Sequence, residues 1–160
     1  MRRETKPRSK SIIRFQDCDP MGHLNNSRYI DYFINAREDQ LLKYYDINVY
    51  QYIQERGRAW VVGKNEIIYK RPALLMENVI IETEVLNFSE KHILVEMRMY
   101  DEKETHVKSV MRSHFVPVDI KTQRSIPHEE YIMELLESVH SPNTQESIEL
   151  RAIELQEELA

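Results

Sequence analysis

The 160-residue sequence predicts an α+β fold in which one antiparallel sheet packs against a long helix. Three observations favour this fold: a helical pattern of apolar residues over 27–45, alternating strand patterns between residues 58 and 117, and short polar links between those strands. The order of one strand, one long helix and four further strands is typical of a sheet with a helix on one face.

The first predicted strand covers residues 11–16 and leads into a turn-rich loop over residues 17–26. A helix is expected over residues 27–45, where polar side chains form one stripe and apolar side chains cover the rest. Asn25 and Asn26 stand where an N-cap belongs, because their side-chain oxygens can accept from unpaired amides of the first turn. The helix therefore begins beside the loop, and we expect it to be mostly buried.

Residues 46–57 are predicted to be a connecting stretch before the run of strands. Residues 58–70 are rich in β-branched and aromatic side chains and end at Arg71-Pro72. Three later segments alternate between apolar and polar residues, so we expect one buried and one solvent-exposed face on each. Their buried positions are Val79, Ile81, Thr83 and Val85, then Ile93, Val95, Met97 and Met99, then Val107, Ser109, Met111, Ser113 and Phe115.

From residue 127 onward the apolar pattern has helical spacing, which predicts two helices on either side of Ser141-Pro142-Asn143. We therefore divide the chain into a disordered basic tail at residues 1–10, a main domain at residues 11–120 and a C-terminal helical extension at residues 121–160. Three roles stay open for the extension: it covers a ligand tunnel, extends an oligomer interface or packs on the sheet.

The composition excludes several classes of partner. A net charge of −5 and a pI near 5.7 argue against a nucleic-acid-binding surface, which is basic. No apolar run approaches the roughly 20 residues that cross a bilayer, so an integral membrane segment is excluded. The single cysteine cannot form an intramolecular disulfide, and no apolar signal region follows the basic start. These features favour a cytoplasmic protein.

The loop after the first strand carries Asp17, Cys18, Asp19, Gly22 and His23. A metal site built from these ligand types lacks a fourth ligand, and three successive side chains cannot all face one ion, so we predict no metal. Cys18 as a nucleophile would need a base held against it, and a buried, inert thiol is the preferred interpretation. On residue chemistry alone, a well-capped helix start explains the loop as well as an active site does.

The stretch from Arg14 to Arg37 resembles the signature of the 4-hydroxybenzoyl-CoA thioesterase branch of the hotdog superfamily, which includes acyl-carrier-protein thioesterases. The matching positions are Arg14, Phe15, Asp17, Asp19, Gly22, His23, Asn25, Asn26, Tyr29, Tyr32, Phe33, Ala36 and Arg37. The later Tyr69-Lys70-Arg71-Pro72 resembles the end of the second strand in that family. The resemblance covers about residues 11–120, and implies a hotdog fold, an acyl-CoA or acyl-carrier-protein substrate, and a homodimer or homotetramer; no cofactor is predicted.

The resemblance also implies roles for the loop residues. Asp19 matches the catalytic second aspartate of the family, Asp17 matches the structural first one, and His23 matches the family histidine. We expect Asp19 to act as base or nucleophile on a thioester, while His23 orients Asp19 or the substrate. The predicted reaction is hydrolysis that releases a carboxylic acid.

Backbone amides and basic side chains complete the predicted site. Amides at the start of the long helix are expected to polarise the thioester carbonyl, because aligned peptide dipoles favour negative charge there. Their residues are Gly22, Asn25 and Asn26. The candidates for binding the phosphates of CoA or phosphopantetheine are Lys70, Arg71 and Arg58, with a solvated strand edge as the alternative.

Two other functions compete with hydrolysis. A non-catalytic acyl-thioester binding protein of the same fold is the main alternative, and the presence of Asp19 and His23 argues against it. A hotdog dehydratase is the second, but its histidine is followed by a Pro-Gly pair that is absent here. The sequence does not specify the length or type of the acyl group.

Overall fold

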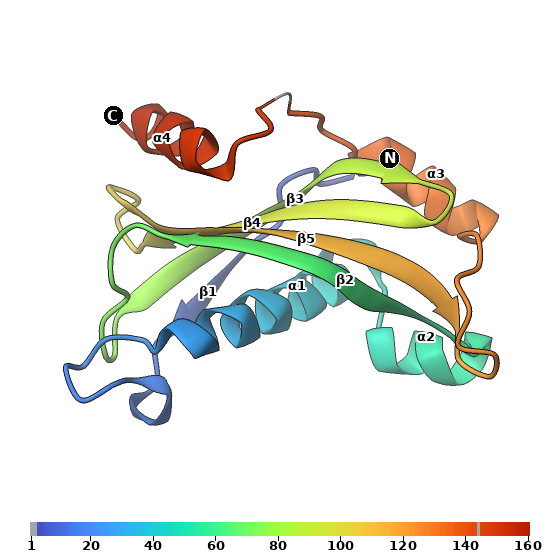
Figure 1. Ribbon diagram of the computed structural model, residues 1–160, viewed down its shortest axis with the longest axis horizontal. Coiled ribbons are helices and arrows are strands. Elements are labelled where there is room, and N and C mark those ends of the chain that lie inside the picture. The colour runs from blue at the N-terminus through green and yellow to red at the C-terminus, as the bar shows by residue number, and fades with distance from the viewer. Residues whose placement is uncertain (1–2, 144) are drawn as a thin grey trace.

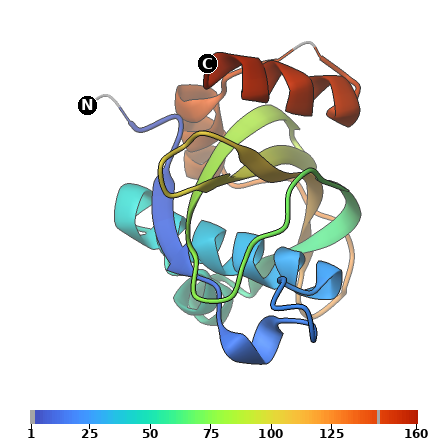
Figure 2. The same cartoon turned by 90° about the vertical axis from the view of Figure 1, so that its left-hand side faces the viewer.

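The computed structural model describes residues 3–143 and 145–160 and has an α+β architecture. Within these residues, one antiparallel sheet has the strand order β1-β3-β4-β5-β2. Helix α1 lies on one face of the sheet and α4 lies on the other (Figure 1, Figure 2). The elements are β1 (Arg8–Ile12), α1 (Tyr29–Tyr45), α2 (Val49–Arg56), β2 (Arg58–Tyr69), β3 (Asn78–Ser89), β4 (His92–Asp101), β5 (Val107–Asp119), α3 (Glu130–Val139) and α4 (Ile148–Glu158).

The main core lies between α1 and the inner face of the sheet. Tyr29, Phe33 and Ala36 of α1 are buried against alternate residues of β3, β4 and β5, as the alternation in the sequence predicts. Val107 is the exception, because a register shift beside Tyr100 places it in the outer apolar cluster instead. The inward-facing residues include Val79, Ile81, Val85, Ile93, Val95, Met97, Met99 and Met111. The predicted hotdog arrangement of a sheet around one long helix is confirmed.

The structure of the first residues differs from two predictions. Strand β1 pairs with β3, with Ser9 opposite Ile81, so the predicted disordered tail over residues 1–10 is wrong for residues 8–10. The predicted strand over residues 11–16 is wrong in its second half, because Phe15–Asp17 form a 3-10 helix. A strand at a sheet edge is held by backbone hydrogen bonds on one side, so it needs no apolar alternation.

Helix α1 ends at Tyr45 as predicted, but begins at Tyr29 after a 3-10 turn over Asn26–Arg28. The predicted capping role of Asn25 and Asn26 is wrong, because neither side chain accepts a hydrogen bond from the first turn. The chain instead enters the helix through the 3-10 turn, in which the Arg28 amide donates to the backbone oxygen of Asn25.

Helix α2 occupies the stretch predicted to be a connection. The Asn48 side chain accepts a hydrogen bond of 3.0 Å from the Gln51 amide, which caps the first turn. Gly57 ends the helix with φ +62°, a left-handed conformation that glycine adopts without a steric penalty. The helix turns the chain back toward the sheet, where β2 begins at once.

The outer face of the sheet differs from the expected solvent-exposed face, because α4 covers part of it. Glu96 and Arg98 are fully buried there. Arg98 Nη1 donates to Glu96 Oε1 at 2.7 Å, and Arg151 Nε of α4 donates to the same oxygen at 2.9 Å. Burial on its own would raise the pKa of Glu96, but the Arg98 and Arg151 guanidiniums together hold it below its usual value.

The two predicted C-terminal helices are present as α3 and α4. A second apolar cluster joins α4 to the outer face through Ile148, Ala152 and Leu155, which pack against Tyr100 and Val110. Packing on the sheet is therefore one role of the extension. No helix in the described residues is long and apolar enough to cross a membrane. The cytoplasmic location and the domain boundary at residue 120 stay predictions.

Candidate active site

The loop after β1 is fastened to the link between β2 and β3. The Leu24 amide donates to Ala73 O at 2.8 Å, and the Leu75 amide donates to Gly22 O at 2.9 Å. At the start of the loop, the Ile13 amide donates to Glu77 O at 2.9 Å. Backbone bonds at both ends of the loop therefore fix its path beside the beginning of α1.

Asp19 closes a tight turn with its own carboxylate. Its Oδ1 accepts from the amides of Met21 at 2.9 Å and His23 at 3.1 Å, and its backbone oxygen accepts from the Gly22 amide at 3.0 Å. Gly22 has φ +77°, as expected for a residue that lets the chain turn sharply. Across the described residues no hydrogen bond is formed by Asp19 Oδ2, so one carboxylate oxygen is fixed and the other is available.

Asp17 makes different contacts. Its Oδ2 accepts from the Tyr32 hydroxyl at 2.7 Å, and that hydroxyl accepts from the Arg14 amide at 2.9 Å. Burial, and next the hydrogen bond to Asp17, raises the pKa of Tyr32 to about 12. The backbone oxygen of Asp17 accepts from the Asn25 amide at 3.0 Å. These contacts give Asp17 a structural position that joins the loop to α1.

Cys18 lies between the two aspartates and is half-buried. Its sulfur is 3.4 Å from Arg14 O, and burial followed by the nearby Asp19 and Asp17 carboxylates raises the pKa of the thiol. A raised pKa disfavours the thiolate that nucleophilic attack requires. Within residues 3–143 and 145–160, no three His, Cys, Asp or Glu side chains gather in a way that could hold a metal ion.

The predicted amide donors differ in availability. The Gly22 and Asn25 amides already donate to Asp19 O and Asp17 O, so the structure argues against both as donors to a substrate. Asn26 is the first residue of the 3-10 turn, and in the described part of the chain its amide donates to no acceptor. Of the three predicted positions, Asn26 is the one whose amide is available at the beginning of the helix.

A pocket of about 280 Å³ opens beside Asp19. Two aromatic residues that sequence reasoning gave no role lie in its wall: the rings of Tyr29 and Tyr69 meet edge to face with centroids 5.0 Å apart. The Tyr69 hydroxyl donates to Asn26 O at 3.0 Å and so links β2 to the helix start. The lining residues are Asp19, His23, Leu24, Asn26, Tyr29, Tyr69, Lys70, Arg71 and Pro72.

Lys70 and Arg71 line this pocket with exposed side chains, and their binding of phosphates stays a prediction. Their amides both donate to Lys108 O, and Lys108 Nζ donates to Pro72 O at 2.9 Å. The structural role of Lys108 was not predicted, because a lysine on an alternating strand is usually a solvent-facing residue. It fixes the turn that presents the two cations.

Arg58 does not join this group. It begins β2, whereas Tyr69 ends it, a separation of roughly 35 Å at about 3.3 Å per residue. Arg58 instead donates to Pro127 O and lies 3.9 Å from Glu129. Within one chain, the prediction that Arg58 meets the same phosphates as Lys70 and Arg71 is therefore wrong.

The sheet wrapped around one helix, with a pocket at the helix start, defines a hotdog-fold protein. The chain belongs to the thioesterase-like superfamily, whose family model matches residues 13–156. It is 28% identical over 127 residues to the long-chain acyl-CoA thioesterase FadM of Escherichia coli strain K12, with 79% of this chain and 94% of that protein covered.

Solved structures agree with this membership. The probable thioesterase YbaW from Escherichia coli superposes with a TM-score of 0.71 and 27% identity, over 84% of this chain and 99% of that one. The Staphylococcus aureus protein SAV2348, solved in complex with CoA, has a TM-score of 0.79 and 11% identity, over 94% of each chain. At that identity the second likeness shows the fold alone.

Proposed function

We propose that the protein hydrolyses acyl-CoA thioesters, with Asp19 as the reacting carboxylate. The strongest support is that the two carboxylate oxygens of Asp19 have different surroundings. Two backbone amides donate to Oδ1, while Oδ2 has no hydrogen bond in the described chain. Asp19 also lines a pocket with His23, Asn26 and two cations. A carboxylate held in this way is oriented without being neutralised.

Two routes are open to this carboxylate. As a general base, Asp19 takes a proton from water while the water oxygen adds to the carbonyl carbon, and the C–S bond then breaks to release the thiolate. As a nucleophile, Asp19 adds to the carbon itself and displaces the thiolate, and water then hydrolyses the resulting anhydride. A thiol with a pKa of about 8.5 leaves readily as thiolate, so neither route needs a strong acid.

Groups at the start of the helix stabilise the carbonyl oxygen and bind the CoA part of the substrate in this proposal. The Asn26 amide, which donates to no acceptor among the described residues, lies at the positive end of the helix dipole, where developing negative charge on a carbonyl oxygen is stabilised. Lys70 and Arg71 at the same pocket suit the phosphates of CoA, since ammonium and guanidinium groups form charge-assisted hydrogen bonds with them. His23 contributes its imidazole to the pocket wall, where it is able to orient substrate or water.

The proposal includes a homodimer formed through β2. This strand is at one edge of the sheet, and Val61 and Val62 on it are 47% and 45% exposed. An edge strand with exposed apolar side chains is a template for pairing with another chain, and two-fold symmetry is the usual result. Sedimentation at several protein concentrations tests this, and Val61→Lys should shift the equilibrium toward the monomer.

The hydrolysis test is a panel of acyl-CoA substrates from short to long chains, with the released thiol detected by a colorimetric reagent. Wild-type protein should release CoA, and Asp19→Asn should lower kcat by about 10²-fold to 10⁴-fold while the thermal midpoint is unchanged. Asp31→Asn is the matched control, because Asp31 is an exposed α1 residue paired with Arg28. An equally active Asp19→Asn protein would refute the assignment, and no release from any chain length would favour the non-catalytic binding protein.

A further inference from the structure

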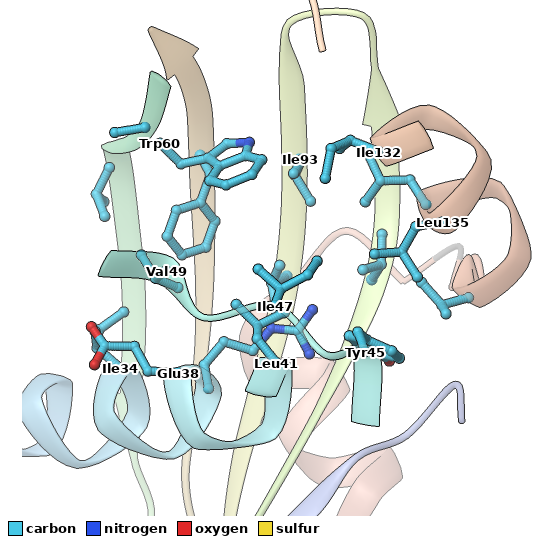
Figure 3. Close-up of a pocket in the computed structure, with 18 of the residues that line it drawn as sticks. Ile34, Glu38, Leu41, Tyr45, Ile47, Val49, Trp60, Ile93, Ile132 and Leu135 are labelled. Carbon is cyan, nitrogen blue, oxygen red and sulfur yellow. The ribbon is translucent and has the colours of Figure 1, made fainter. Parts of the chain in front are cut away.

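A second cavity, of about 270 Å³, lies beneath the sheet at the opposite end of α1 from Asp19. In Figure 3, Ile34 and Leu41 of α1 lie on one side of it, Trp60 of β2 lies on another, and Ile132 and Leu135 of α3 close a third. Apolar side chains of α2, β2, β3, β4 and β5 complete the lining, among them Ile53, Val62, Val85 and Phe115.

The polar residues at this cavity are already engaged elsewhere. Arg37 Nη1 donates to Thr83 Oγ1 at 2.7 Å, and the Tyr45 hydroxyl donates to Glu4 O at 2.6 Å. Glu38 accepts from the Tyr50 hydroxyl at 3.4 Å. A polar or charged ligand would therefore lose hydrogen bonds to water without gaining replacements, whereas an aliphatic chain would lose none.

The same two elements border both cavities. Tyr29 and Tyr69, at the pocket beside Asp19, belong to α1 and β2, and so do Ile34 and Val62 at the second cavity. Between them, Ile30 of α1 and Ile67 of β2 are apolar and only partly buried. A row of apolar side chains thus runs along the helix from one cavity to the other, and Tyr29 to Leu41 spans about 18 Å at 1.5 Å per residue.

We infer that this cavity receives the far end of a long aliphatic acyl chain whose thioester lies at Asp19. The inference rests on the proposed function and adds the substrate class to it. The carbonyl end stays among polar groups at the helix start, and the chain follows the apolar row into the cavity. Each methylene buried there should raise kcat/KM by about fourfold until the cavity is full.

Helix α3 of the C-terminal extension helps to determine which acyl chain lengths fit the cavity. Four of its apolar residues line the cavity: Ile132, Leu135, Leu136 and Val139. Because α3 forms one complete side of the cavity, its side chains limit the chain length that fits. This corresponds to the predicted role of covering a ligand tunnel, and it differs from that of α4, which packs on the other face.

Trp60 makes a direct test possible, because it lies in the cavity wall and is the single tryptophan of the chain. The probes are non-hydrolysable thioether analogues of acyl-CoA with bromine, a quencher of tryptophan fluorescence, on the terminal carbon. A sixteen-carbon probe should quench Trp60, and an eight-carbon probe should bind without quenching, as judged by calorimetry. Equal quenching by both probes, or bound probes that leave the fluorescence unchanged, would overturn the inference.

Substitutions in two separate walls extend the test to catalysis. Leu135→Trp and Ile53→Trp should each lower kcat/KM for a sixteen-carbon acyl-CoA by about tenfold or more and leave a short-chain substrate unaffected. The matched controls are Leu150→Trp and Gln54→Trp, which lie at exposed positions of α4 and α2. Equal loss on all chain lengths in folded protein would refute the inference, whereas hydrolysis of no substrate by wild type would refute the proposed function instead.

Discussion

The Tyr32 hydroxyl donates to Asp17 Oδ2 across 2.7 Å, so the first carboxylate of the loop is bound to α1. Asp19, two residues later, makes no such bond to the helix and keeps its Oδ1 within its own turn. The hydrogen bonds thus distinguish the two carboxylates: one fastens the loop, and the other faces the pocket. Their substitutions should have different effects.

Tyr32→Phe and Asp17→Asn should each lower the free energy of unfolding by about 1 to 3 kcal/mol, because each weakens a hydrogen bond to a charged acceptor. Urea unfolding midpoints measure the loss. Tyr50→Phe is the control, since its hydroxyl is exposed and lies 3.4 Å from Glu38. If Tyr32→Phe unfolds at the wild-type midpoint, the Asp17 contact does not stabilise the loop.

Replacing both Lys70 and Arg71 by alanine should raise KM for acyl-CoA about tenfold with little change in kcat, because the charges bind phosphate away from the reacting bond. The salt dependence of KM should fall as well. Steady-state kinetics at two ionic strengths provide the readout. Lys91→Ala, which removes an exposed cation between β3 and β4, should leave KM unchanged, and a rise equal to that of the double variant would contradict the assignment of phosphate binding to Lys70 and Arg71.

Arg151→Met should destabilise the protein by about 3 kcal/mol or more, because it removes a guanidinium from the buried carboxylates Glu84 and Glu96. Chemical denaturation measures the change. Adding Glu96→Gln to the same protein should restore part of the loss. Glu154→Gln, which removes an exposed partner of Arg151, should change stability by less than about 1 kcal/mol. A loss from Arg151→Met no larger than that would show that the buried network contributes little.

His128 should make the protein less stable in mild acid. Burial lowers its pKa below the ordinary value of 6.5, and its Nε2 accepts a hydrogen bond of 3.0 Å from Trp60 Nε1, which a proton would abolish. Below pH 6.5 the unfolded chain binds the proton more readily, so stability falls as the pH drops toward the lower pKa of the folded state.

Thermal unfolding between about pH 7 and pH 5 tests this prediction. His128→Gln keeps an acceptor and cannot titrate, so its midpoint should fall less steeply with pH than that of the wild type. His106→Gln provides the control at a position without such burial. Identical slopes for the wild type and His128→Gln would assign the acid sensitivity to other groups.

Features with a strong local pattern were predictable from the sequence. The inner face of β3 and β4 follows strict alternation, as at Ile81 and Met97, because burial on one face of a strand repeats every two residues. The loop around Asp19 was found through its resemblance to a family, since Asp, Gly and Asn alone are also ordinary turn residues. The sequence therefore indicated the loop that lines the pocket, but it did not reveal that the Gly22 and Asn25 amides donate within that loop.

The errors arose where tertiary contacts override local pattern. Glu96 and Arg98 alternate with apolar residues like solvent-facing side chains, but a distant helix buries them by supplying Arg151. Helix α2 was missed although Asn48 and Gly57 mark its two ends, because its eight residues are too short a stretch to show a helical period. The cavity near Trp60 combines residues from distant parts of the chain, so no sequence window contains it.

Helix α4 also constrains how this sequence can diverge. Glu84, Glu96 and Arg98 suit a sheet that is covered by a helix carrying an arginine, and they would be poorly matched to a bare sheet or to an apolar cover. A lineage that lost the last helix would come under selection at all three positions. Among related sequences, the charged triplet and the terminal helix should therefore be inherited or lost together.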